Sequence, residues 1–131
     1  MSADGGENMV RLELESLIQF EDARPAVHPV ADSGHARVLL VCLREGQGLK
    51  DHRSTSQVMA HCLRGSVTFY ADGVPSGLEA GSVAFVEPNH YHRMEARSES
   101  VVLVVMAPHP AREGYPREHL DRIIVRSRSN D

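Results

Sequence analysis

Residues 46–65 read GQGLKDHRSTSQVMAHCLRG and carry more structural information than any other part of the chain. A glycine-rich turn precedes His52, and an apolar run from Val58 to Leu63 ends at Arg64 and Gly65. A short apolar run between turn signals is typical of a strand in the core of a β-sandwich or β-barrel. The stretch therefore predicts a turn, a buried strand and a second turn.

The same pattern recurs along the chain, with glycine, proline or aspartate every 8 to 12 residues or so. Four more runs are predicted strands, at residues 38–43, 67–70, 83–86 and 101–106. Asp72 and Gly73 predict a hairpin turn after the second of these runs, and Pro108 and Pro110 end the last one. The sequence thus predicts an all-β single domain over residues 1–131, with a barrel core at about 36–107.

The flanking segments have weaker patterns. Residues 12–18 fit either a short helix or an edge strand, and we expect residues 1–8 and 127–131 to be frayed ends. Near the C-terminus, Pro116 fits the first position of a short helix that covers one end of the barrel. Its apolar face would be formed by Tyr115, Leu120, Ile123 and Ile124.

Composition excludes several classes of protein. The formal net charge is -4 and the pI is near 6.0, which is unlike a general nucleic-acid-binding protein. The longest apolar run, residues 101–107, is too short to span a membrane. Cys42 and Cys62 lie inside apolar runs, as reduced core thiols do. We therefore expect a cytoplasmic protein that binds neither nucleic acid nor membrane.

Histidines are the most informative polar residues. Of eight, four lie close to turns or strands of the predicted core: His52, His61, His90 and His92. Here the sequence resembles the cupin superfamily. Its first motif is matched by Gly46, by His52 after five intervening residues, and by the closing Gly65. Its second motif is matched by Gly81 and His92, with Asn89 at the position of a family glycine. Asparagine adopts left-handed backbone more readily than other non-glycine residues, so this exchange is mild.

The resemblance implies a double-stranded β-helix, a barrel of two antiparallel sheets that is often dimeric. It also implies a pocket in which three histidines and a glutamate hold a divalent metal such as Fe, Mn, Ni or Zn. Imidazole and carboxylate ligands suit these ions. An immunoglobulin-like sandwich would give similar strand spacing, but it would not explain the positions of these glycines and histidines.

Two of the four family ligand positions are changed in this chain. Ser54 stands at the second histidine position and Val58 at the glutamate position. His52 and His92 remain as predicted metal ligands, and His90 is the best third ligand. Gln57 is a further donor only if a bulge turns it inward, because it lies one residue from the family position. We expect Gln57, Val58 and Phe85 to line a substrate pocket.

Two main functions follow from this reading. One is a metal-dependent enzyme, an oxygenase, isomerase or lyase acting on a small organic molecule. The other is a metal-free cupin that binds a small ligand or has a regulatory role; the lost ligand positions favour it. A third is a dimeric scaffold whose barrel is filled by its own side chains. We further expect a homodimer, with His61 on the outer face of its strand or at the dimer interface.

Overall fold

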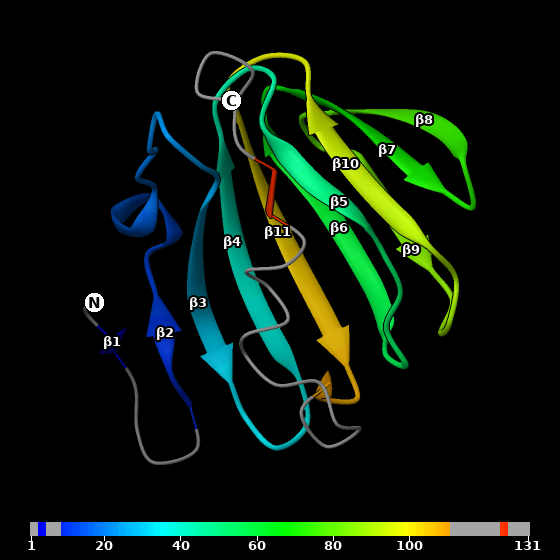
Figure 1. Ribbon diagram of the computed structural model, residues 1–131. Helices are drawn as coiled ribbons and strands as arrows, with labels where there is room; N and C mark the ends of the chain where they lie inside the picture. The colour runs from blue at the N-terminus through cyan, green and yellow to red at the C-terminus, as the bar shows by residue number, and fades with distance from the viewer. Residues whose placement is uncertain (1–2, 5–8, 111–123, 126–131) are drawn as a thin grey trace.

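The computed structural model describes residues 3–4, 9–110 and 124–125 (Figure 1). These residues form twelve strands and a single turn of 3-10 helix, η1 (Leu14–Leu17). The strands are β1 (Ala3–Asp4), β2 (Arg11–Leu12), β3 (Ala26–Asp32), β4 (Arg37–Leu43), β5 (Gly48–His52), β6 (Gln57–Arg64), β7 (Ser66–Ala71), β8 (Val74–Glu79), β9 (Val83–Val86), β10 (His92–Ala96), β11 (Ser100–Ala107) and β12 (Ile124–Val125).

Two five-stranded antiparallel sheets form the barrel. One has the order β3-β4-β11-β6-β9 and the other the order β12-β5-β10-β7-β8. Strands that are distant in sequence lie side by side, as β4, β11 and β6 do in Figure 1. This arrangement is the predicted double-stranded β-helix. The five strands predicted from apolar runs are β4, β6, β7, β9 and β11, and the expected hairpin joins β7 to β8.

The core lies between the two sheets, and strand periodicity determines which side chains enter it. On β6, Val58, Ala60 and Cys62 face the core, whereas His61 lies on the outer face between them. From the other sheet, Val67 and Phe69 of β7 pack against the same core. Alternate residues of a strand point to opposite faces, so the spacing within the β6 run correctly predicted the outward position of His61.

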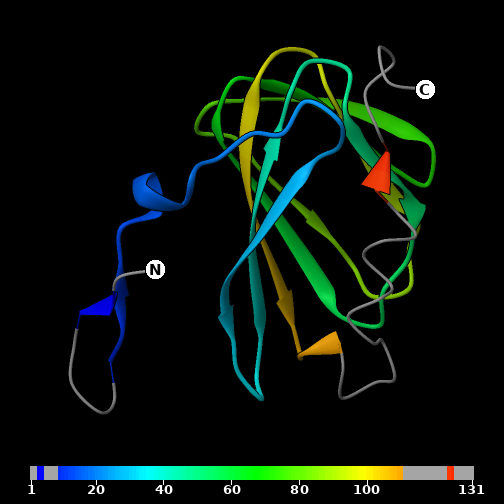
Figure 2. The same cartoon turned by 60° about the vertical axis from the view of Figure 1, so that its left-hand side comes forward.

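The N-terminal segment covers part of the outer face of the β3-β4-β11 sheet. Leu17, Ile18 and Phe20 pack against a second cluster of buried residues that includes Leu40 and Cys42. The strands β1 and β2 pair only with each other and lie outside the barrel (Figure 2). Residues 12–18 thus contain both of the structures between which the sequence did not decide. No helix within the described residues is long and apolar enough to cross a membrane.

The two chain ends differ in part from expectation. Ile124 lies in strand β12, which pairs with β5, so its assignment to a C-terminal helix is wrong. Isoleucine is β-branched, and β-branched residues favour strands over helices. The remaining residues of that predicted helix, and the predicted frayed segment 127–131, lie outside the described residues. Within the predicted frayed segment 1–8, Ala3 and Asp4 form β1.

The turns at the motif positions need left-handed backbone. Gly65 has φ +78°, and a Cβ there would collide with the backbone oxygen of Glu99 and the side chain of Ser100. Only glycine satisfies both conditions. Asn89 has φ 69°, so the asparagine occupies the left-handed position that was inferred for it.

Candidate functional site

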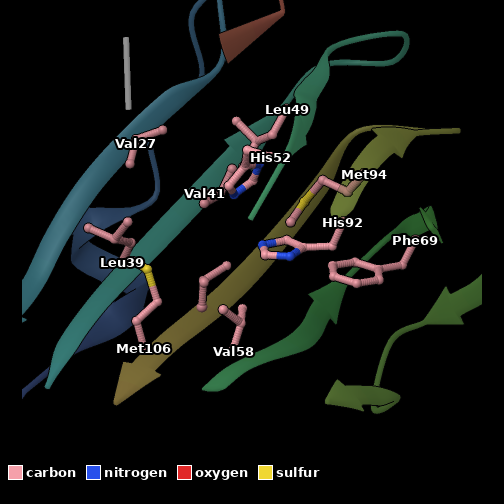
Figure 3. Close-up of a pocket in the computed structure, with 11 residues that line it drawn as sticks. Val27, Leu39, Val41, Leu49, His52, Val58, Phe69, His92, Met94 and Met106 are labelled. Atoms are coloured by element: carbon pink, nitrogen blue, oxygen red, sulfur yellow. The ribbon is translucent and has the colours of Figure 1, made fainter. Parts of the chain in front are cut away.

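A pocket of about 440 Å³, including the part open to solvent, lies between the two sheets (Figure 3). Eleven side chains of the described residues line it, and nine of them are aliphatic, thioether or phenyl groups. These lining residues are Val27, Leu39, Val41, Leu49, His52, Val58, Phe69, His92, Met94, Val104 and Met106. The polar side chains among them are two imidazoles.

The two imidazoles come from different motifs and meet through strand pairing. His52 ends β5 and His92 begins β10, and the two residues are direct partners in the antiparallel ladder. Their ring centroids lie 4.2 Å apart in an edge-to-face arrangement with an interplanar angle of 63°. Phe69 stacks on the other side of His92 with a centroid distance of 6.1 Å. The His92 ring is thus held between two aromatic neighbours.

A backbone hydrogen bond holds Nδ1 of each ring. Nδ1 of His52 donates to the carbonyl of Lys50 at 2.7 Å, and Nδ1 of His92 donates to the carbonyl of His90 at 3.1 Å. A neutral imidazole has one N–H, so Nε2 of neutral His92 carries the lone pair. His92 therefore offers an acceptor or ligand nitrogen on the side away from its own backbone.

Burial keeps His92 neutral. The residue is 5% exposed. Its burial among apolar groups lowers the pKa of the imidazole below the ordinary value of 6.5. The hydrogen bond to His90 and the charge of Asp51 act in the opposite direction but do not overcome burial. At neutral pH His92 is accordingly an uncharged acceptor.

The structure brings three of the six predicted site residues together and places three elsewhere. His52, His92 and Val58 line the pocket. The side chain of His90 is 55% exposed, and its Nδ1 bonds Asp72 at 2.7 Å rather than reaching the pocket. Gln57 is exposed and donates to Glu87. Phe85 lies on the outer face of β9 and is 66% exposed.

The positions of the two changed family ligands also follow from local structure. Val58 is buried in the pocket wall, at 3% exposure. Ser54 is buried in the loop after β5, where its hydroxyl accepts the Ser56 N–H at 3.0 Å and its carbonyl accepts the Asn89 N–H at 2.7 Å. Its side chain stabilises this loop.

Sequence reasoning missed most of the pocket wall, including Phe69, Met94 and Met106. Met94 could have been predicted as a pocket residue, because it lies two residues after His92 on the same face of β10. Phe69 is the ladder partner of Met94 on β7, a pairing that no local pattern signals. The pocket residues of β3 and β4, Val27, Leu39 and Val41, reach the pocket only in the closed barrel, so no local pattern predicts them either.

Solved structures of other proteins share this fold. TT1209 from Thermus thermophilus is similar over 76% of this chain and 98% of its own, with 27% identity and a TM-score of 0.73. An uncharacterised protein with a double-stranded β-helix domain from Klebsiella pneumoniae has 18% identity and a TM-score of 0.71, over 77% of this chain and 91% of its own. An RmlC-like cupin protein from Desulfovibrio desulfuricans has 22% identity and a TM-score of 0.66, over 80% and 97%.

A search of curated proteins gave no match. The family model described as "Cupin domain" matches residues 39–108, more than half of the chain, and the match includes both pocket histidines. This protein is a small member of the cupin domain family.

Proposed function

We propose that this cupin binds a small organic molecule in its barrel, through His52 and His92, without a metal ion. The observation that carries the proposal is the composition of the pocket wall, in which two imidazoles are the polar side chains among nine apolar ones. Pockets for small ligands combine a mainly apolar wall with a few placed polar groups. The described part of this wall has that composition.

The residues of the pocket do not fit the divalent metal that the family resemblance implies. Catalytic metal sites such as those of zinc enzymes use three protein ligands and leave one position open. Here the wall supplies two imidazole nitrogens and no carboxylate, and Val58 occupies the family's carboxylate position. Within residues 3–4, 9–110 and 124–125, no group of three His, Cys, Asp or Glu side chains is placed to hold a metal ion.

Restoring the family's ligands tests this part of the proposal. The double variant Ser54→His/Val58→Glu adds an imidazole and a carboxylate to His52 and His92. We expect it to bind Mn²⁺ or Zn²⁺ at least 100-fold more tightly than the unmodified protein, measured by calorimetry and elemental analysis. Near-stoichiometric metal in the unmodified protein, lost on substitution of both His52 and His92, would contradict the proposal.

Blocking the pocket tests ligand binding itself. Val58→Phe places a larger side chain on the inner face of β6, whereas Val74→Phe makes the same exchange at an exposed position of β8. A library of small neutral fragments, screened by ¹H–¹⁵N NMR, is expected to perturb residues around the pocket in the unmodified protein and in Val74→Phe. Those perturbations should disappear in Val58→Phe. Equal perturbation in both variants would place binding elsewhere.

We also propose that the outer face of β9 joins two copies of the chain. β9 forms one edge of its sheet and exposes Phe85 and Val83, beside the outward-facing Met59 and His61 of β6. An exposed apolar patch next to an edge strand is a typical association surface. Phe85→Ser should convert a dimer to a monomer in light scattering. Val74→Ser, on the edge strand β8 of the other sheet, should leave the dimer intact.

A further inference from the structure

The pocket is characterised by whether its polar groups donate or accept hydrogen bonds, and not only by how few polar groups it has. The imidazole of His92 uses Nδ1–H to donate to the backbone carbonyl of His90, so its acceptor nitrogen Nε2 is directed away from that backbone. The His92 ring is buried and faces the cavity in Figure 3. An incoming group can bond to this nitrogen only by donating a hydrogen.

Apart from the two imidazoles, the described lining side chains are valine, leucine, methionine and phenylalanine, none of which donates a conventional hydrogen bond. A carboxylate or ether oxygen placed against these side chains would lose its bonds to water without replacement. Such desolvation disfavours a neutral acceptor and disfavours a charged acceptor far more strongly.

We propose that the pocket selects uncharged ligands that carry a hydroxyl or N–H donor on an apolar body, and discriminates against carboxylates of the same shape. This inference rests on the proposed ligand-binding function and names its ligand class. The donor bonds Nε2 of His92, and the apolar body contacts side chains such as Val58, Met94 and Met106. The selectivity follows from two features, the fixed tautomer of His92 and the lack of donors among the apolar side chains described in the wall.

Four probes of similar size separate the contributions. Benzyl alcohol carries a donor, benzyl methyl ether carries only an acceptor, benzoate carries a charged acceptor, and toluene carries neither. We expect benzyl alcohol to bind about tenfold more tightly than toluene or the ether at pH 7.5, as one hydrogen bond would give. Benzoate should bind at least as weakly as the ether. Titrations followed by NMR measure all four affinities.

Variants connect the preference to the proposed nitrogen. His92→Phe removes the acceptor and keeps a ring of similar size, so benzyl alcohol and toluene should bind it equally. His35→Phe makes the same exchange at an exposed position and should keep the tenfold preference. Long-range ¹H–¹⁵N NMR of the unmodified protein reads the tautomer directly, and it should report Nδ1–H for His92.

The outcomes distinguish this inference from the proposed function. Equal binding of benzyl alcohol and toluene, benzoate binding as tight as that of the alcohol, or an Nε2–H tautomer in His92 would overturn the selectivity and leave ligand binding intact. Failure of all four probes, toluene included, would contradict the ligand-binding function and the selectivity together.

Discussion

The two ends of the barrel differ in how their buried polar side chains are hydrogen-bonded. At the end formed by the β4–β5, β6–β7 and β10–β11 connections, buried polar side chains bond backbone groups of their own and of neighbouring segments. Gln47, fully buried there, accepts the Arg44 N–H and donates to the carbonyls of Glu21 and Asp22. Ser100, also fully buried, accepts the Ser66 N–H at 3.0 Å. The hydrogen-bonding groups of these two side chains are thus satisfied within the protein.

At the opposite end, two imidazoles line a cavity. Each donates one nitrogen's hydrogen to the backbone, and the buried ring of His92 faces the pocket. Both ends carry residues at family motif positions. Gly46, Gly65 and Gly81 are retained and Asn89 keeps left-handed backbone in place of a family glycine, whereas two of the four ligand positions are changed. Turn geometry and pocket chemistry are therefore separable in this fold.

The largest effect is expected at Gly65, at the same end of the barrel as Gln47 and Ser100. Gly65→Ala combines left-handed strain with collision against Glu99 and Ser100, and should lower the free energy of unfolding by about 3–5 kcal/mol. Gly73→Ala is the control, because it has φ +80° but no atom within 4 Å of the added Cβ. Urea denaturation should show a loss of about 1–2 kcal/mol there. Equal losses would show that strain alone, without collision, explains Gly65.

Gln47 gives the next largest effect. Gln47→Leu leaves the carbonyls of Glu21 and Asp22 and the Arg44 N–H without their partner in the fully buried amide, which should cost about 2–4 kcal/mol in urea denaturation. Gln57→Leu, at an exposed glutamine on β6, is the matched control and should change stability by less than about 0.5 kcal/mol. A small loss at Gln47 would mean that water replaces its bonds and that this end is not sealed.

Asp32, at the cavity end, should show a smaller and pH-dependent effect. Its hydrogen bond from Nε2 of the buried His109 lowers its pKa below 3.8, and Arg37 adds a favourable charge. A lowered carboxyl pKa contributes stability that is fully present well above pH 3.8 and is lost as the pH falls from there through the lower pKa of the folded state. The Asp32 side chain is 38% exposed and its interactions are screened by solvent, so Asp32→Asn should lose only about 0.5–1 kcal/mol at neutral pH and less as the pH falls below 3.8. Thermal melts across this range, with Glu13→Gln as an exposed control, measure the difference.

His92→Phe should have the smallest effect on stability and should abolish the preference for benzyl alcohol over toluene. It exchanges a desolvated imidazole for a phenyl ring and loses one hydrogen bond, so unfolding at pH 7.5 should change by less than about 1 kcal/mol. The lowered pKa of His92 means that the unmodified protein loses stability as the pH falls below 6.5, because unfolding then takes up a proton. Below that pH, the free energy of unfolding of the variant should therefore rise relative to that of the unmodified protein. A constant difference from pH 8 to pH 5 would contradict the buried neutral state of His92.

The sequence predicted the strands that are continuous apolar runs and missed those that other residues interrupt. Continuous apolar runs identified β4, β6 and β11, which are neighbours in one sheet, and also the edge strand β9. β3 contains His28 and Pro29, and β8 contains Pro75 and Gly77, residues that interrupt a strand pattern but are tolerated at the edge of a sheet. β5 and β10 lie inside the other sheet, but charged residues interrupt their apolar pattern, so they were missed as well.

The site was predicted where strand spacing applies and not where a turn intervenes. His52, Val58 and His92 lie on strands, and their inward direction follows from the motif spacing. His90 precedes β10 in a turn that includes the left-handed Asn89, and there the alternation of faces does not apply. Gln57 and Phe85 lie on strands but on the outer face, one residue out of phase with Val58 and Val86.

The pairing of β5 with β10 also determines when the pocket comes into existence during folding. About 40 residues separate His52 from His92, and a closed loop of this length carries a larger entropic cost than the β7–β8 hairpin, which forms locally. Barrels built from such distant pairings fold slowly, in milliseconds to seconds. The imidazole rings of His52 and His92 become neighbours only when that loop has closed. Ligand binding followed during refolding would therefore time barrel closure, as distinct from the earlier formation of individual hairpins.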